Sequence, residues 1–330
     1  VELPILEYLA PSEVDVALWL IECINASILD ISDNRWRFAH DKLREALLED
    51  FTPERLREVH RQIAQAMEHL YADDPNHTVS LAYHFREAEL WDKAATYAIK
   101  AGDALNRVSH YTRLLRLYDP ILPHITERDT RIRLLVAYCM ALYRLSRYEE
   151  LLVNAQELMT LIGEDETYQD KLAETMTHVG WGHVFNGDYE KAQFNFERAY
   201  RIHQTLEDDY GMVRALHGRG TIAFFYGDSE LGGQFQQRAL ALSQKIDDKQ
   251  GMADSYVNLG VLAFVNKAYR QSIEHSHQAL ALFDELGELR GIALINNNLA
   301  LCHEALNELD EAENCYKISL DALAQIQDQR

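Results

Sequence analysis

The sequence predicts an all-α protein, a solenoid of stacked helical hairpins, and three observations lead to this fold class. Apolar residues recur at the spacing i, i+3, i+4 and i+7 almost everywhere after Pro53, for example at Leu134, Ala137, Tyr138 and Ala141. Sustained alternation of apolar and polar residues, the pattern of a half-buried strand, is nearly absent. From residue 172 onward the sequence repeats itself with a period of about 40 residues.

The repeat shows as columns of similar residues that are 40 positions apart. The columns are Gly180, Gly220, Gly260 and Ala300; Gly187, Gly227, Lys267 and Asn307; Ala199, Ala239, Ala279 and Ser319; and Gly211, Gly251 and Gly291. Each period predicts two helices joined by a turn at NGDY, YGDS, NKAY or NELD. A glycine inside a helix costs about 0.5–1 kcal/mol relative to alanine, so its return at one phase indicates a close approach of two helices.

Gly180, Gly182 and Gly187 stand close enough together to suggest a phosphate-binding loop. The gap between Gly182 and Gly187 fits a Walker motif, but Asp188 and Tyr189 occupy the positions that need lysine and serine or threonine. Helical periodicity, not a strand, precedes the glycines. We therefore interpret them as helix-packing positions, and the sequence predicts no nucleotide site.

Residues 1–50 have a different character. A helix is expected from near Ser12, followed by a short hairpin over residues 26–40, in which a polar Ser-Asp-Asn turn separates the two apolar segments. This order of helix, hairpin and helix resembles a winged-helix module. Residues 1–50 contain eleven acidic and four basic residues, so we do not expect this region to contact DNA and interpret it as a packing module.

The composition argues against several classes of function. The formal charge of −21 would repel a phosphate backbone, so nucleic acid is not an expected partner. No apolar run is long enough to span a membrane. The four cysteines are far apart, without a CxxC pair, which suits buried thiols in the cytoplasm better than disulfides or zinc. The histidine spacings give no metal site, and no nucleophile elbow is present, so no catalytic residue, metal or cofactor is expected.

Residues 172–330 resemble the tetratricopeptide repeat. The resemblance rests on a small residue at the eighth position, an aromatic near the eleventh or seventeenth, and alanines near the twentieth and twenty-seventh, matched by Gly180, Tyr189, Ala192 and Ala199. The period of about 40 residues exceeds the usual length of about 34, and the additional residues fall between repeats. Weaker repeats over residues 83–105 and 141–158 bring the expected total to six or seven hairpins, stacked in one dimension.

Residues 35–68 show a second resemblance, to the segment that follows the ATPase core in signal-transduction ATPases with numerous domains, the STAND proteins. In that group an F-x-H-[DA]-x-[LIV]-R-E-A string closes a winged helix and leads into helical repeats. The matching residues are Phe38, His40, Asp41, Leu43, Arg44, Glu45 and Ala46. No Walker A or B motif occurs in the chain, so the resemblance implies an ATPase domain upstream of Val1, in cis, or none at all. The predicted domains are 1–50, 51–171 and 172–330.

The repeat resemblance also implies a candidate binding surface, because the first helix of each pair lines a concave groove in that family. The residues it places there are His178, Trp181, Phe185, Arg214, His217, Phe225, Asp254, Asn258, Asn297 and Asn298. Related repeats use asparagine at the position of Asn258 and Asn298 to hold an extended peptide backbone, since an amide both donates and accepts. Two alternatives stay open: the asparagines tie helices together, or the aromatics fill the core.

Two functions are consistent with these features, and neither is catalytic. The first is a sensor or docking region that binds a peptide, a protein or a small effector in the groove and regulates an upstream signalling ATPase. The second is a structural scaffold without an effector. It would join protomers or partners through its convex face or through its open end, where the last helix, over residues 311–326, has no polar closing helix.

Overall fold

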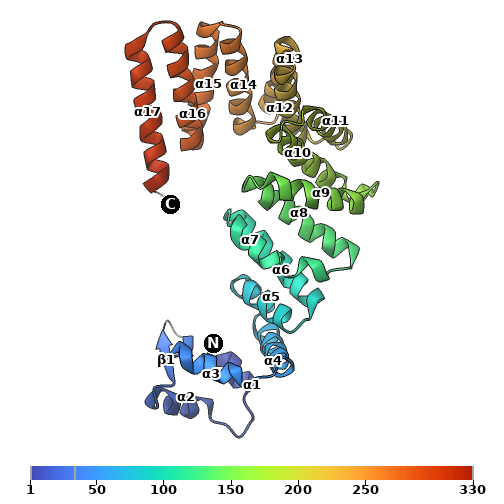
Figure 1. The fold of residues 1–330 in the computed structure, drawn as a ribbon, viewed down its shortest axis with the longest axis vertical. Coiled ribbons are helices and arrows are strands. Elements are labelled where there is room, and N and C mark those ends of the chain that lie inside the picture. Colours follow the sequence, from blue (N-terminus) through green and yellow to red (C-terminus); the bar gives the residue numbers. More distant parts are fainter. Residues whose placement is uncertain (1, 33–34, 329–330) are drawn as a thin grey trace. The chain divides into compact units, whose positions relative to one another are not determined.

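A computed structural model describes residues 2–32 and 35–328, and within those ranges it contains 17 α-helices and one β-hairpin. The predicted all-α fold of stacked helical hairpins is therefore confirmed (Figure 1). The chain divides into two compact units, Val1–Ser146 and Arg147–Arg330. No helix in the described ranges is both long and apolar enough to cross a membrane.

The first unit opens with short elements and continues with longer helices. In order, they are α1 (Leu3–Leu9), α2 (Val16–Asn25), β1 (Leu29–Ser32), β2 (Arg35–Phe38), α3 (Asp41–Glu49), α4 (Pro53–Tyr71), α5 (Thr78–Glu87), α6 (Trp91–Arg107), α7 (Tyr111–Tyr118) and α8 (Arg128–Arg144). The helix expected near Ser12 begins at Val16, because the Asp15 side chain accepts a hydrogen bond from the Leu18 amide at 3.0 Å and caps the helix there.

The predicted hairpin over residues 26–40 is confirmed. Strands β1 and β2 pair antiparallel, with Ile31 opposite Trp36 and Leu29 opposite Phe38. Residues 33 and 34 of the expected Ser-Asp-Asn turn lie outside the described residues. The order of α2, hairpin and α3 agrees with the predicted winged-helix module, whose assignment stays a prediction.

Helices α4 to α8 pack in succession, and small residues set their spacing. In α6, Gly102 lies directly against the buried Tyr118 side chain of α7, where a Cβ would collide with the phenol ring. The Phe85 ring of α5 stacks on Tyr97 of α6, with ring centroids 5.5 Å apart. Helices α5 and α6 pack together as a hairpin, which is the weaker repeat predicted over residues 83–105.

The second unit is the regular part of the fold. In order, its helices are α9 (Tyr148–Ile162), α10 (Gln169–Phe185), α11 (Tyr189–Thr205), α12 (Asp209–Phe225), α13 (Ser229–Lys245), α14 (Lys249–Val265), α15 (Tyr269–Leu286), α16 (Leu289–Ala305) and α17 (Leu309–Asp328). Each pair from α10/α11 to α16/α17 is one period of the sequence repeat, and Figure 1 shows the pairs following one another in order.

The turn inside each pair explains the second sequence column. Gly187 and Gly227 have φ of +76° and +81°, a left-handed conformation that glycine adopts without strain. Lys267 and Asn307 hold the same conformation in the next two pairs, with φ of +61° and +62°. Thus the glycine of the suspected phosphate loop ends a helix, while Gly180 and Gly182 lie inside α10.

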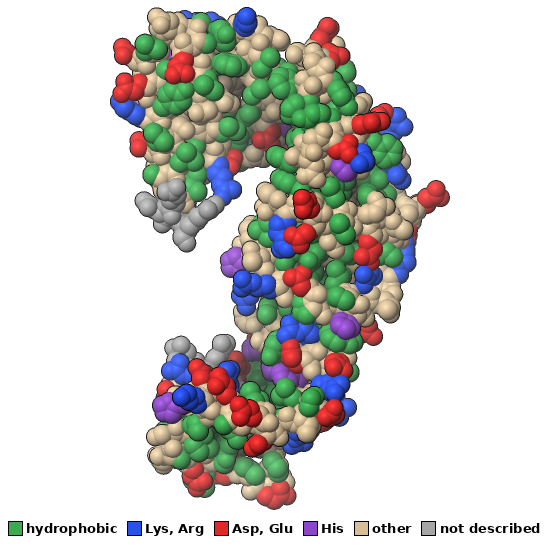
Figure 2. Space-filling view, viewed as in Figure 1, with side chains coloured by type: hydrophobic (Ala, Val, Ile, Leu, Met, Phe, Trp, Pro, Cys, Tyr) green, Lys and Arg blue, Asp and Glu red, His purple; other side chains and the backbone are tan. Residues whose placement is uncertain are grey.

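The first helices of the four pairs form a continuous row. Helix α10 contacts α12, α12 contacts α14, and α14 contacts α16, while the second helices α11, α13 and α15 each pack between two first helices. In the described part of this unit, successive second helices contact each other less than successive first helices do. Because the first helices lie closer together, their row is on the inside of the curve of this unit. Acidic and basic side chains are interspersed over the face shown in Figure 2.

Candidate functional site

The row of first helices carries a small cavity between α14 and α16, which we call the α14–α16 cavity. Its volume is about 170 Å³. The lining residues are Gly260, Val261 and Phe264 of α14, Ser272 of α15, and Asn298, Leu301 and Cys302 of α16. A Cβ at Gly260 would make only ordinary contacts with α15, the nearest atom being Ser276 Oγ at 3.5 Å.

The polar groups at the floor of the α14–α16 cavity already have hydrogen-bond partners within the protein. The Ser272 hydroxyl donates to the Gly260 carbonyl oxygen at 2.8 Å, and the Cys302 thiol donates to Ser272 Oγ at 3.2 Å. Burial raises the pKa of the Cys302 thiol, so it stays protonated. The Asn298 amide is different: within the described residues it has no hydrogen-bond partner. This amide is thus available to a ligand at the wall of an apolar cavity.

Exposed apolar side chains surround the α14–α16 cavity. Val261 and Leu301 are each 38% exposed, while Val265 and Leu294 reach 50% and 49%. These residues come from the first helices α14 and α16, and the exposed Asn297 lies beside them in the chain. Exposed apolar residues gathered around a cavity are typical of a binding surface, whereas isolated ones are ordinary.

Asn258, the other candidate asparagine, is already engaged. Its amide donates to Gln236 Oε1 at 3.3 Å, and Gln236 Nε2 donates to the His217 carbonyl oxygen at 3.3 Å. Gln236 is 1% exposed, so this chain of bonds connects α12, α13 and α14 inside the protein. The structure therefore places Asn258 in an inter-helix tie and Asn298 in a cavity wall.

The candidate histidines lie below the surface of the row. His217 is buried, and its Nε2 is 2.9 Å from Ser255 Oγ of the next first helix. Burial lowers the pKa of His217 to about 4, so the ring is neutral at physiological pH. His178 is also buried, at 8% exposure. His217 thus connects α12 with α14, and both histidines present little surface to solvent.

The charged candidates lie at the edge of the same row. Arg214 forms an exposed ion pair with Glu174 of the preceding first helix, with an Nη1 to Oε1 distance of 3.9 Å. Asp254 occupies the matching position on α14, where burial raises the pKa of its carboxyl to about 6, and nearby Glu288 and Asp248 act in the same direction. Gln250 donates to this carboxyl at 3.1 Å.

The candidate aromatics have partners inside the protein. The Phe185 ring stacks on Tyr148, and the Phe225 ring stacks on Tyr189, with centroids 4.5 Å and 4.6 Å apart. Trp181 meets Phe196 edge to face at 5.3 Å. The tyrosine partners were not predicted from the sequence, although a tyrosine at the start of each of these second helices was the available signal. The stacks leave Phe185 63% and Phe225 45% exposed, so each shows one face to solvent.

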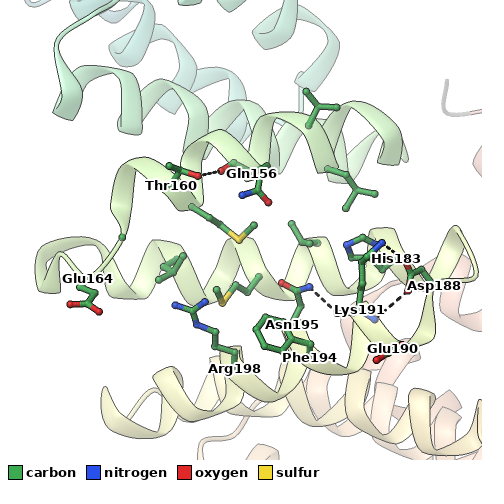
Figure 3. A pocket seen from close by; sticks show the side chains of 17 residues that line it. Gln156, Thr160, Glu164, His183, Asp188, Glu190, Lys191, Phe194, Asn195 and Arg198 are labelled. Carbon is green, nitrogen blue, oxygen red and sulfur yellow. Dashed lines mark hydrogen bonds and ion pairs between the residues drawn. The ribbon is translucent and has the colours of Figure 1, made fainter.

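A second and larger cavity was also not predicted from the sequence. It lies between α9 and α11 over α10, has a volume of about 1140 Å³, and is here called the α9–α11 hollow (Figure 3). Leu172, Met176 and Val179 of α10 line it, and polar and charged side chains from α9 and α11 stand around them. Within the described ranges, no three His, Cys, Asp or Glu side chains gather closely enough to hold a metal ion.

Comparisons with known proteins agree with this geometry at the level of the fold. Residues 251–325 match the tetratricopeptide repeat family. No curated protein matches the chain. One similar solved structure is a STAND protein with a tetratricopeptide repeat sensor from Pyrococcus horikoshii, with a TM-score of 0.55 and 15% identity. That match covers 100% of this chain and 49% of the other, so this chain spans about half the length of that protein.

Two further solved structures are similar in the same way. A Rap protein complexed with competence and sporulation factor has a TM-score of 0.56 and 12% identity, covering 88% of this chain and 92% of that one. Aspartyl phosphate phosphatase F from Bacillus subtilis has a TM-score of 0.52 and 12% identity, covering 86% and 80%. Such identities show a common fold alone. With the repeat match and the described helices, they establish the chain as a helical protein of tetratricopeptide-like repeats.

Proposed function

We propose that the chain binds a peptide or protein segment along α14 and α16, with one apolar side chain of the ligand in the α14–α16 cavity. The observation that carries this proposal is the unpartnered Asn298 amide in the wall of a cavity of about 170 Å³. An apolar cavity of roughly 150 Å³ accommodates benzene in another protein, so this space fits one aliphatic or phenyl side chain. The amide can then pair with the ligand backbone, which needs both a donor and an acceptor.

The exposed rim supplies the remaining contact area. Val261, Val265, Leu294 and Leu301 are the side chains that an extended segment would cover as it crosses from α14 to α16. Burial of apolar surface contributes about 25 cal/mol per Å², so a few such side chains give a useful part of a micromolar affinity. Asn297, Arg214 and Asp254 extend the proposed site along the row and set its preference for charge.

The finer part of the proposal is that ligand binding regulates a signalling ATPase domain upstream in the same protein. Two observations support it: the fold similarity to the STAND sensor protein, and the F-x-H-D-x-L-R-E-A string, which runs from the end of β2 into α3. For regulation, the ligand must bind one arrangement of the repeats more tightly than another, because equal affinity shifts no equilibrium.

A displayed library of random peptides tests the binding proposal. A selected peptide is labelled, and its affinity for the purified chain is measured by fluorescence anisotropy. The Val261→Glu variant, changed at the cavity rim, should bind at least about tenfold more weakly. The matched control is Val108→Glu at the end of α6, where valine is 59% exposed. Loss of binding in the control with retention in Val261→Glu would contradict the proposed site.

A second candidate function is association through α17. Leu320 and Leu323 are 65% and 45% exposed, whereas their equivalents one repeat earlier, Leu280 and Phe283, are covered by α16. Phe283 is only 2% exposed. Light scattering over a range of concentrations tests this candidate function. We expect the apparent mass of the wild-type chain to rise with concentration, and the double variant Leu320→Glu with Leu323→Glu to stay at the monomer mass. An unchanging monomer mass would contradict it.

A further inference from the structure

The α9–α11 hollow is the site of this inference, because the next repeat fills the same space with its own side chains. Over α12, the Arg219 guanidinium lies between two aromatic rings, 5.2 Å from the Tyr200 centroid and 4.4 Å from the Phe235 centroid. Arg238 covers Tyr200 as well, at 5.2 Å. These rings and cations occupy the space between α11 and α13, and cation–π attraction stabilises them there.

The repeat register identifies the equivalent residues over α10. Tyr148 and Tyr189 begin the second helices α9 and α11 and stack on equivalent phenylalanines, which aligns these two helices from their first residues onward. In this alignment Met159 of α9 corresponds to Tyr200 of α11. The sequence columns pair the remaining residues with those one repeat later: Val179, Asn195 and Arg198 correspond to Arg219, Phe235 and Arg238.

All four equivalent residues line the α9–α11 hollow. Two aromatic rings and one guanidinium have been replaced by the smaller side chains Met159, Asn195 and Val179, and this loss of volume leaves the space open. Of the four positions, only that of Arg238 keeps its residue type, as Arg198. Figure 3 shows Arg198 and Asn195 on α11, beside this space.

The charge of Arg198 is not neutralised inside the protein. In the described part of the chain this guanidinium makes no ion pair and covers no ring, whereas Lys191 on the same helix pairs with Asp188 at 2.6 Å. The hollow also has apolar residues at equivalent positions on its two sides: Val153 of α9 is 73% exposed and Phe194 of α11 is 61% exposed. An unpaired cation beside an apolar space is complementary to the face of an aromatic ring.

We propose that the α9–α11 hollow binds an aromatic side chain of a partner protein segment, which takes the place that Tyr200 has in the next repeat. Arg198 covers the ring as Arg238 covers Tyr200, and Val153 and Phe194 contact the apolar residues beside it on the segment. The volume of about 1140 Å³ exceeds the space of one ring, so the occupant is a segment and not an isolated aromatic molecule. This site lies among second helices and is independent of the α14–α16 cavity.

The test uses methyl NMR of the full chain, with Met159 and Met176 as reporters inside the hollow. The probes are p-cresol, a helical alanine-rich peptide with one central tyrosine, and the same peptide with leucine there. The tyrosine peptide should shift both methionine methyls and bind more tightly than p-cresol. The leucine peptide should bind about fivefold more weakly, as expected for a cation–π contact of about 1 kcal/mol.

Arg198→Gln should reduce the affinity for the tyrosine peptide by a similar factor and leave the affinity for the leucine peptide unchanged. The matched control is Arg201→Gln, an exposed arginine one turn further along α11 that pairs with Glu197 at 2.5 Å. Both changed residues are exposed, so both variants should fold. Absence of shifts with the tyrosine peptide, or equal affinity of both peptides in wild type, would overturn the proposal. Binding of p-cresol without the peptide would contradict a protein segment as the occupant.

Discussion

The ring of Phe196 lies so close to Gly180 that a Cβ on residue 180 would be 2.6 Å from its Cε1 atom. At Gly260, in the same sequence column, a Cβ would meet nothing nearer than Ser276 Oγ at 3.5 Å, an ordinary contact. The fourth member of the column is Ala300. One sequence column therefore contains a position that requires glycine and a position that accepts alanine.

These two glycines give the first prediction. Gly180→Ala should lower the free energy of unfolding by roughly 1–3 kcal/mol, because Phe196 is buried and must move. Gly260→Ala should leave stability unchanged or raise it by about 0.5–1 kcal/mol, through the better helix propensity of alanine. Urea unfolding followed by circular dichroism measures both. Equal losses in the two variants would show that close packing does not explain the column.

The tie between Asn258 and Gln236 gives the second prediction. Asn258→Ala should cost about 1 kcal/mol, since it removes a partner of the buried Gln236 amide. In a Gln236→Leu background the same change should cost much less, because the partner is already absent. A double-mutant cycle from urea unfolding measures the coupling, and additive losses would mean that the bond adds nothing to stability.

His217 gives a prediction on pH. Burial lowers the pKa of His217 in the folded chain to about 4, below the ordinary value of 6.5. Between these values the unfolded chain binds more protons, so the free energy of unfolding falls as pH falls from 6.5 towards 4, by roughly 3 kcal/mol for this group. His217→Gln keeps a donor for Ser255 and does not titrate. Its stability should depend less on pH in this window; identical slopes would contradict the assignment.

Asp254 gives a prediction on pH of the opposite sign: its contribution to the free energy of unfolding rises as pH falls. Burial raises the pKa of this carboxyl to about 6 from 3.8, so its charge destabilises the folded chain at neutral pH, and protonation removes this cost as pH falls below 6. Asp254→Asn should therefore raise the free energy of unfolding by about 1–3 kcal/mol at pH 7.5. The gain should shrink towards pH 4. Thermal unfolding across that range measures it, and a loss of stability at pH 7.5 would refute it.

Much of the fold could be predicted from the sequence because its causes are local and repeat. The helical period, the turn residues and the glycine columns each depend on spacing along one chain. Gly187 ends a helix, and Gly180 packs against a ring, as that spacing indicated. The hairpin over residues 26–40 followed from its apolar segments.

The candidate site was harder to predict, because the role of a side chain depends on what its neighbours already satisfy. Asn258 and Asn298 occupy the same repeat position, yet Gln236 engages only Asn258. The residue that corresponds to Gln236 one repeat later is Ser276, which cannot reach as far. Phe185 could be placed on the row, but its stack on Tyr148 of the preceding pair could not.

The central claim, that Asn298 holds a ligand and not a neighbouring helix, is tested most directly by measuring affinity and stability together. Wild type and Asn298→Ala are compared for anisotropy binding of a library-selected peptide and for melting temperature in the same buffer. We expect affinity to fall roughly tenfold, the loss of about 1.5 kcal/mol of hydrogen bonding, with the melting temperature almost unchanged. Unchanged affinity with a melting temperature several degrees lower would show that Asn298 is structural.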